Sequence, residues 1–277
     1  MKKTVLITGA SSGIGEAIGK RLLEEGWKVY GAARRVERLK GLEDKGASVI
    51  RLDVTDDGSM KSCANAVLAK EGRIDALINN AGYGSYGAIE DVPLNEARRQ
   101  FEVNVFGLAR MAQLVLPAMR EQRSGRIVNI SSMGGKLFTP MGGWYHATKH
   151  AVEALSDALR LEAGLFGINV IIIVPGVIHS EWPKIAVDNL IKVSGKTAYA
   201  RLAGSMVSAI KNSYKSRGAV GPDVIAKVVS KALKAKNPKA RYVAPIDAKI
   251  LLFLWRILPD RVFDNLLRSA LKLPENP

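Results

Sequence analysis

Two hydrophobic periods alternate along the first 180 residues of the chain. Short β-branched runs predict strands, and several are apolar at every position, which indicates burial on both faces. The segments between them repeat apolar residues three and four apart, which is the spacing of an amphipathic helix. The predicted strands are 4–8, 28–32, 48–53, 76–79, 126–131, 169–175 and 240–243, and the predicted helices are 15–25, 59–70, 94–121 and 145–164.

Alternating strands and helices predict an α/β fold, a Rossmann-type doubly wound parallel sheet of about seven strands with a C-terminal helical extension. We expect residues 1–277 to form a single dinucleotide-binding domain, which is an ordinary size for one α/β unit. Residues 177–221 contain glycine and serine without a clean period, and we expect them to form a mobile lid over the substrate. Residues 245–277 predict amphipathic C-terminal helices, broken at Pro259.

A glycine-rich turn connects the first strand to the first helix. Such a turn lets the backbone approach a pyrophosphate, which then meets free N–H groups and the positive end of the helix dipole. The spacing differs from the GxGxxG fingerprint, and a merely tight turn is the alternative interpretation. The candidate phosphate-binding residues are Gly9, Ser11, Ser12, Gly13, Ile14 and Gly15.

The end of the second strand indicates which dinucleotide binds. An acidic residue there would accept hydrogen bonds from the ribose 2′-hydroxyl of NAD, but the sequence has Arg34 and Arg35. A guanidinium suits a 2′-phosphate through charge-assisted hydrogen bonds, so the sequence favours NADP(H) over NAD(H). Arg34 is the better candidate for this contact. The alternative is that one of the two arginines simply faces solvent.

Tyr145 and Lys149 lie four residues apart in a predicted helix, so the phenol and the ammonium share one face. A nearby positive charge favours the phenolate, and we expect it to lower the tyrosine pKa toward a useful acid/base range. Ser131 and Ser132 end the fifth strand, where a hydroxyl can bind a substrate carbonyl oxygen while the tyrosine donates a proton. Ser132 has the better spacing, and Ser131 is expected to face the other side of the strand.

In order and spacing, several motifs together resemble the short-chain dehydrogenase/reductase family, closely over about residues 1–180. They are Thr8–Gly15, Asn79-Asn80-Ala81-Gly82, Asn104, Ser132, Tyr145, Lys149 and Pro175-Gly176.

This resemblance implies a role for each matching catalytic residue. Tyr145 would be the general acid/base, and Ser132 would orient and polarise the substrate oxygen. Lys149 would hold the nicotinamide ribose and lower the tyrosine pKa. Asn104 would hold a water that passes protons from the lysine to solvent.

The resemblance also implies further contacts to the cofactor. Asp53 and Val54 would contact the adenine, although a helix N-terminal or turn aspartate is the alternative interpretation of Asp53. The loop with Asn80, Ala81 and Gly82 would stabilise the central sheet beside the cofactor. Pro175 and Gly176 precede Ser180, which stands where the family commonly has a threonine that touches the nicotinamide carboxamide.

Three other residues near these motifs invite functional interpretations. His146 follows Tyr145 directly, but adjacent helical residues point about 100° apart, so its imidazole is expected to face elsewhere. His179 and Trp182 lie at the expected base of the lid, where contact with substrate and simple packing are both open. No cluster of Cys, His or Asp residues in the sequence has the spacing of metal ligands, and we expect no metal site.

The chain has a formal net charge of +15, and the residues from Glu181 onward contain 18 Lys/Arg against 7 Asp/Glu. Such a surface could attract nucleic acid, so a non-catalytic cofactor-sensing regulator or nucleic-acid binder on the same fold is the alternative function. No aromatic-plus-basic RNA motif or helix-turn-helix pattern supports it, and we expect no nucleic-acid partner. The single cysteine, Cys63, and an amino terminus without signal-peptide architecture favour the cytoplasm.

Residues 140–144 and 258–261 resemble the branch of the family with 17β-hydroxysteroid, retinol and acyl-dihydroxyacetone-phosphate reducing enzymes. This resemblance implies a small lipophilic ketone, aldehyde or secondary alcohol as substrate. The resemblance to the family as a whole implies a homodimer or homotetramer. Residues 248–277 carry cations among apolar residues, which is compatible with peripheral contact to a membrane surface. Packing on the same domain or on a second subunit is the alternative.

Overall fold

The computed structural model describes residues 2–215 and 219–274 and contains one seven-stranded, all-parallel sheet. The strand order is β3-β2-β1-β4-β5-β6-β7, so the order reverses between β1 and β4. The strands are β1 (Thr4–Thr8), β2 (Lys28–Ala33), β3 (Ser48–Arg51), β4 (Ala76–Asn79), β5 (Gly125–Ile130), β6 (Ile168–Pro175) and β7 (Arg241–Ala244). This confirms the predicted Rossmann-type sheet, with strand ends that differ by at most two residues from those predicted.

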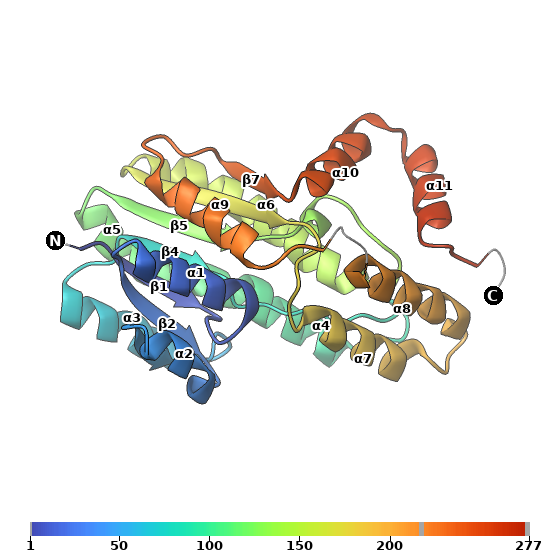
Figure 1. Ribbon diagram of the computed structural model, residues 1–277, viewed down its shortest axis with the longest axis horizontal. Coiled ribbons are helices and arrows are strands. Elements are labelled where there is room, and N and C mark those ends of the chain that lie inside the picture. The colour runs from blue at the N-terminus through green and yellow to red at the C-terminus, as the bar shows by residue number, and fades with distance from the viewer. Residues whose placement is uncertain (1, 216–218, 275–277) are drawn as a thin grey trace.

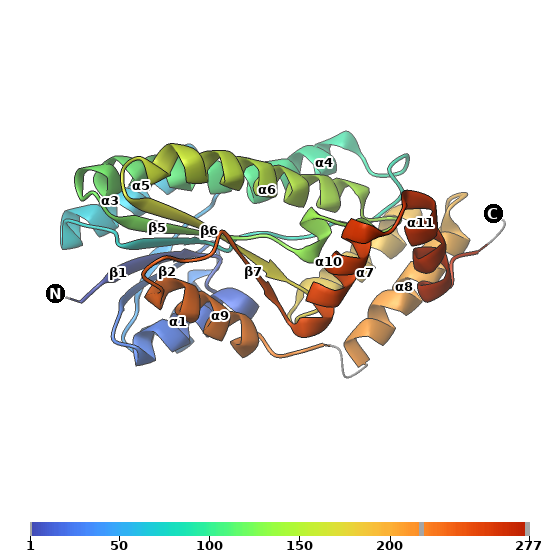
Figure 2. The same cartoon turned by 90° about the horizontal axis from the view of Figure 1, so that it is seen from above.

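Helices cover both faces of the sheet (Figures 1 and 2). On one face α1 (Gly13–Glu24) packs against α9 (Asp223–Lys234), and beside them lie the 3-10 turn η1 (Val36–Leu39) and α2 (Lys40–Glu43). On the other face lie α3 (Asp57–Glu71), α5 (Gly107–Glu121) and α6 (Gly143–Gly164). Alternate residues of β1 enter the two cores: Val5 and Ile7 pack toward α1 and α9, and Leu6 packs toward α3 and α5. Burial on both faces explains why these strands are apolar at every position.

The predicted helix 94–121 is divided in the structure. It consists of α4 (Leu94–Phe101), a π-helical turn η2 (Glu102–Phe106) and α5, which has Pro117 inside it. The wider turn contains Asn104, whose side chain is buried. Hydrophobic periodicity did not predict this turn, because π-helix occurs mostly as a single turn inside an α-helix, and one turn has little effect on the period of a long segment.

The segment expected to form a lid contains two helices that the sequence analysis did not predict. Residues 177–221 contain α7 (Trp182–Ser194) and α8 (Ala200–Lys215), which pack against each other. Their buried positions include Ala186 and Leu190, and Ala203 and Met206, which do recur at helical spacing. Small residues and flanking glycines and serines weaken this pattern in the sequence. The helix α9 was not predicted either.

Two helices follow the last strand, α10 (Ile246–Ile257) and α11 (Asp260–Ala270), with Pro259 between them. Figure 1 shows them extending from β7 at the end of the molecule where α7 and α8 also lie. The ring of Trp255 stands 4.7 Å from that of Phe263 and 5.5 Å from that of Phe138, centroid to centroid. This aromatic group fastens both helices to the loop that precedes α6.

The edge strand β7 is tied to α6 by a partly buried ion-pair network. Nε of Arg241 lies 2.7 Å from Oε2 of Glu153, which is almost fully buried, and the same guanidinium also binds Asp157. Lys136 provides a second cation at 3.1 Å from Glu153. Removing the arginine would leave a buried carboxylate with less compensation, which is more costly than losing an exposed pair.

We predict that Arg241→Met lowers the free energy of unfolding by about 1–3 kcal/mol, measured by chemical denaturation. Lys20→Met, which removes an exposed pair with Glu16, is the control and should cost less than about 0.5 kcal/mol. In the double variant with Glu153→Gln the loss should be smaller than the sum of the two single losses. If the two single losses are additive, Arg241 and Glu153 are not coupled.

Candidate active site

The loop between β1 and α1 owes its shape to glycines that cannot be replaced without a clash. Gly9 has φ of +66°, and a Cβ there would lie 2.8 Å from Cα of Ala81. A Cβ on Gly15 would lie 2.4 Å from the carbonyl oxygen of Gly9. Gly13 has φ of +57°, in the left-handed region that favours glycine. The sequence therefore brings the loop from β1 directly against the loop that follows β4.

Asn80 and Thr8 lock these two loops together. The side-chain amide of Asn80 donates to the carbonyl oxygens of Thr8 and Gly9, at 3.1 and 2.9 Å. The hydroxyl oxygen of Thr8 in turn accepts from the backbone N–H groups of Asn80 and Ala81, both at 3.1 Å. Gly82, next in the chain, leaves room for Asn104 and Lys149: a Cβ there would lie 3.1 Å from Oδ1 of Asn104 and 3.7 Å from Nζ of Lys149.

The start of α1 fits the phosphates of a dinucleotide. The N-cap residue Ser12 makes no side-chain hydrogen bond to the helix, so it leaves the first N–H groups for another acceptor. This helix end lies at the carboxyl edge of the sheet, where the strand order reverses between β1 and β4, which is where α/β folds bind ligands. Ser11, Ile14 and the glycines described above belong to the same turn.

The structure separates the two arginines that follow β2. Arg35 lies 3.4 Å from Glu181, and Arg38, which the sequence analysis did not single out, lies 2.8 Å from the same carboxylate. Arg34 instead lies where its charge acts on Asp53. The sequence carried no signal for the contacts of Glu181, because more than 140 positions separate it from both arginines.

Asp53 adopts the turn geometry that was its alternative interpretation. Its Oδ1 accepts hydrogen bonds from both the N–H and the hydroxyl of Thr55, at 3.0 and 2.8 Å. Although burial raises the pKa of Asp53, these bonds and the charge of Arg34 bring it below its ordinary value. Val54 packs on the start of α5, since a Cβ on Gly107 would lie 2.4 Å from its carbonyl oxygen.

Three side chains named from the sequence converge between β5 and α6. Tyr145, in the first turn of α6, lies beside Ser132, which follows β5 and whose hydroxyl acts to lower the tyrosine pKa. The Ser132 oxygen also accepts from the N–H of Gly134 at 3.1 Å, which orients it. Lys149 lies one turn further along α6 and donates to the carbonyl oxygen of Ile130 at 2.9 Å. Ser131 points away from Tyr145: its buried hydroxyl lies near Gly135 and Glu153.

The electrostatics of this site differ in one respect from the sequence expectation. Burial raises the pKa of Tyr145 by more than the nearby Ser132 hydroxyl lowers it, and Lys149 does not reverse the shift. Burial also lowers the pKa of Lys149 to about 8, more than the charge of Glu153 raises it. Desolvation disfavours the charged form of both groups, so at neutral pH the phenol keeps its proton.

Asn104 is held by protein groups on three sides. Its amide nitrogen donates to the carbonyl oxygen of Tyr83 at 2.9 Å and to the hydroxyl of Thr148 at 3.0 Å, and its oxygen accepts from the N–H of Tyr83 at 3.0 Å. Asn104 therefore fixes the loop after β4 to α6 beside Lys149. Any further partner must use its oxygen or the backbone of the π-turn.

Aromatic rings close over Tyr145. The ring centroid of Trp182, at the start of α7, lies 5.4 Å from that of Tyr145 and 5.5 Å from that of Tyr86. The Trp182 indole nitrogen is buried without a hydrogen-bond partner. The same turn brings Ser180 toward the phosphate loop, because a Cβ on Gly13 would lie 3.4 Å from that of Ser180. Tyr86 has no distinguishing motif in the sequence, and only its position in the fold reveals it.

The two histidines considered in the sequence analysis, His146 and His179, have packing roles. Burial lowers the pKa of His146 to about 4, and its ring nitrogens bond the carbonyl oxygen of Gly134 at 3.1 Å and Thr139 at 3.0 Å. It is therefore a neutral packing residue rather than a proton carrier. The ring of His179 contacts Tyr214 of α8. Within residues 2–215 and 219–274, no group of three or more His, Cys, Asp or Glu side chains is arranged to hold a metal ion.

Lys149 yields a test through pH-dependent stability. Its folded pKa of about 8 lies below the ordinary value, so burial of the ammonium destabilises the fold at pH 7. That penalty disappears as pH rises from about 8 to the ordinary lysine pKa, because the unfolded chain binds more protons in this range. We predict that the parent gains about 2 kcal/mol relative to Lys149→Met between pH 7 and pH 10, measured by urea denaturation. If the free energies of unfolding of the parent and of Lys149→Met change equally with pH, this prediction is wrong.

Comparison with known proteins identifies the family. The family model described as short chain dehydrogenase matches residues 3–189. The chain is 37% identical over 95% of its length to a probable short-chain type dehydrogenase/reductase of Helicobacter pylori, covering 96% of that protein. It is 35% identical to an NADPH-dependent 3-dehydrocapnine reductase of Ornithobacterium rhinotracheale, with 96% of each chain covered. It is also 35% identical to a 3-ketodihydrosphingosine reductase of Bacteroides thetaiotaomicron, covering 95% of this chain and 96% of that protein.

Solved structures agree with this assignment. A short-chain dehydrogenase from Streptomyces avermitilis superposes with a TM-score of 0.80 at 35% identity, covering 98% of this chain and 96% of that one. Two further solved structures of the same fold, at 27% and 25% identity, contain NADP+ and NAD respectively. The chain therefore belongs to the short-chain dehydrogenase/reductase family of oxidoreductases.

Proposed function

We propose that the protein is an NADP(H)-dependent oxidoreductase that transfers a hydride between the nicotinamide and a lipophilic ketone, aldehyde or secondary alcohol. Tyr145 is the general acid/base. The observation that carries this proposal is the buried phenol of Tyr145 beside the hydroxyl of Ser132, with the ammonium of Lys149 one helical turn away.

The raised pKa of Tyr145 suits reduction. A phenol that keeps its proton at neutral pH can donate it to an oxygen that becomes an alkoxide, and Ser132 orients that oxygen with a second hydroxyl. Lys149, whose pKa is about 8, can return a proton to Tyr145 after each turnover. Asn104 is a positioning residue that holds the Tyr83 loop beside Lys149. The bound cofactor supplies the hydride.

The glycine turn from Gly9 to Gly15 would hold the pyrophosphate, and Arg34 would hold the 2′-phosphate. Arg35 already has a carboxylate partner in Glu181, so Arg34 is the better candidate. We propose adenine contacts for Asp53 and Val54, and contacts near the nicotinamide for Pro175, Gly176 and Ser180. The name of the 3-dehydrocapnine reductase records NADPH dependence, which supports the choice of NADP(H).

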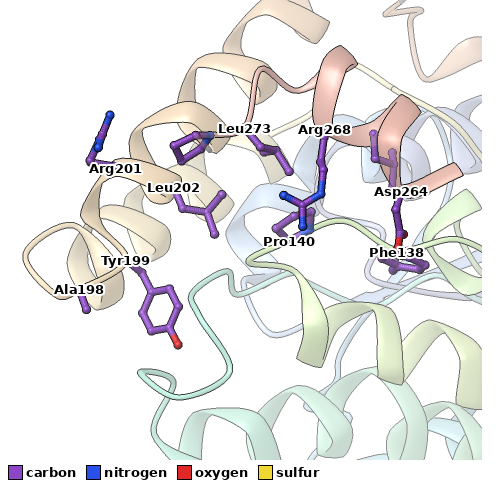
Figure 3. Close-up of a pocket in the computed structure, with 11 residues that line it drawn as sticks. Phe138, Pro140, Ala198, Tyr199, Arg201, Leu202, Asp264, Arg268 and Leu273 are labelled. Carbon is purple, nitrogen blue, oxygen red and sulfur yellow. The ribbon is translucent and has the colours of Figure 1, made fainter. Parts of the chain in front are cut away.

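A lipophilic substrate is supported by the surroundings of Tyr145. The tyrosine belongs to an apolar cluster that also contains Tyr86, Met141, Leu190 and Met206. A cavity of about 640 Å³ lies at the far side of this cluster, between α8, α11 and the loop before α6. Figure 3 shows Leu202 of α8 on one side of it and Arg268 and Leu273 on the other. The cavity does not reach Tyr145, since Trp182 covers the phenol, so we propose that residues 177–221 act as a lid that moves when substrate enters.

We also propose a homodimer or homotetramer in the cytoplasm. Large apolar side chains are exposed along α4–α6 and the π-turn between them, and they could pack against a second copy. These residues are Leu94, Phe106, Leu155 and Leu161.

We predict that Tyr145→Phe lowers kcat for NADPH-dependent reduction of lipophilic ketones by about 10³-fold. The dissociation constant for NADPH should change less than about threefold, because the ring is retained. Tyr30→Phe, which removes a phenol bonded to Glu71 far from the site, is the matched control and should keep kcat. A Tyr145→Phe variant that turns over substrate as fast as the parent would refute the proposed mechanism.

For the cofactor, Arg34→Asp should raise the dissociation constant for NADPH by about 10- to 100-fold and leave that for NADH within about threefold. Isothermal titration calorimetry measures both constants. Arg120→Asp makes the same charge change at a cation that stacks on Phe166, and should alter neither strongly. If Arg34→Asp weakens both dinucleotides equally, another group reads the 2′-position.

A further inference from the structure

The outer face of α10 carries a continuous stripe of large apolar side chains in contact with solvent. Ile246, Ile250, Phe253 and Ile257 are 55–67% exposed, and their spacing of four, three and four residues places them on one helix face. Soluble proteins seldom leave such a row uncovered. We call these four residues the α10 stripe.

The α10 stripe is not the face by which the helix packs on its own fold. Ala248 is almost fully buried, and the ring of Trp255 contacts those of Phe138 and Phe263 edge to face. Both lie on the side of the helix opposite the stripe, since they are about half a turn away from Ile250 at 100° per residue. On α11, Val262 and Leu266 add further exposed apolar surface.

Cations border the α10 stripe. Lys249 and Arg256 are seven residues apart, so they lie on the same side of the helix, along one edge of the stripe. Among the described residues, neither cation forms a salt bridge. Asp247, the one acidic residue of α10, is engaged with the backbone N–H of Ala248 at 2.8 Å.

We propose that α10 and α11 dock the protein on the surface of a bilayer that contains anionic lipid. The α10 stripe enters the boundary between headgroups and acyl chains, and Lys249 and Arg256 meet the lipid phosphates. Of the helices in residues 2–215 and 219–274, none is long and apolar enough to cross a bilayer, so α10 lies in the membrane plane.

Charge distinguishes this occupant from a second copy of the chain. In a two-fold dimer formed through the α10 stripe, the stripes of the two copies would face each other. Lys249 and Arg256 of both copies would then lie at the same interface. A bilayer with anionic phosphates instead complements those cations, and the chain as a whole carries +15.

Docking on this face also bears on the route of the substrate, an inference that rests on the proposed function. Leu267, Arg268 and Leu273 of the same C-terminal segment line the 640 Å³ cavity. Leu273 also packs against the apolar cluster that contains Tyr145. The helix α11 would therefore lie between the bilayer and this cavity, with its exposed apolar residues toward the lipid and its cavity-lining residues on the other face.

Co-sedimentation of the full-length protein with vesicles tests the proposal without any turnover. The parent should pellet with phosphatidylglycerol/phosphatidylcholine vesicles and far less with pure phosphatidylcholine. Phe253→Ser should weaken binding to the anionic vesicles by at least about tenfold. Leu165→Ser, at a 79% exposed leucine just after α6, should leave it unchanged.

The role of the cations is tested with the double variant Lys249→Glu, Arg256→Glu. It should weaken binding to the anionic vesicles by at least about 25-fold, or about fivefold for each cation removed. The control is Lys227→Glu with Lys231→Glu on α9, which changes the net charge by the same amount at two exposed lysines. Its effect should be less than about threefold. An equal effect of both pairs would overturn the proposal, because binding would then follow net charge alone.

Two other outcomes would also overturn it. One is a parent that stays in the supernatant with anionic vesicles. The other is a Phe253→Ser variant that changes the oligomer mass by light scattering but not vesicle binding, which would assign the stripe to a second copy. NADPH oxidation with a short water-soluble ketone is measured separately and should be unchanged in Phe253→Ser. Absence of NADPH oxidation by the parent with both the short ketone and lipophilic ketones would instead refute the proposed function.

Discussion

The site depends on an ammonium group kept inside the protein. Nζ of Lys149 is buried, bonds the carbonyl oxygen at the end of β5 and lies one turn from Tyr145, so the helix α6 and the central sheet are joined at the place where the chemistry is proposed. Burial of this charge opposes folding at neutral pH. The fold tolerates it because Glu153 lies one turn further along α6 and supplies a compensating charge.

The carboxyl ends of parallel strands bring distant parts of the chain to this ammonium. Thr8 and Asn80 fasten the loops after β1 and β4 to each other, and Asn104 fastens the latter to α6. Ser132 follows β5, and Ser180 follows β6. The reversal of strand order between β1 and β4 leaves the phosphate turn beside these groups. One sheet edge thus serves both the cofactor and the acid/base group.

The sequence predicted much of this arrangement, because strands buried on both faces and glycine turns have strong local signals. Its motifs also singled out Tyr145, Ser132 and Lys149, which the fold brings together. Other features have no local signal. The π-turn at Asn104, the contacts of Glu181 with Arg35 and Arg38, and the Trp182 ring over Tyr145 arise from packing between distant segments. The predicted direction of the Tyr145 pKa shift was wrong for the same reason. Burial by the tertiary fold raises this pKa, whereas the spacing of Lys149 led us to expect a lower value.

The central claim is that the Tyr145 phenol gives its proton to the substrate oxygen as the hydride arrives. The most direct measurement is the rate of a single turnover of NADPH with a saturating ketone in H₂O and in D₂O, at matched positions on the pH profile. The account predicts a slower hydride step in D₂O for the parent and no such difference in the residual rate of Tyr145→Phe. Equal single-turnover rates of the parent in the two solvents would contradict it.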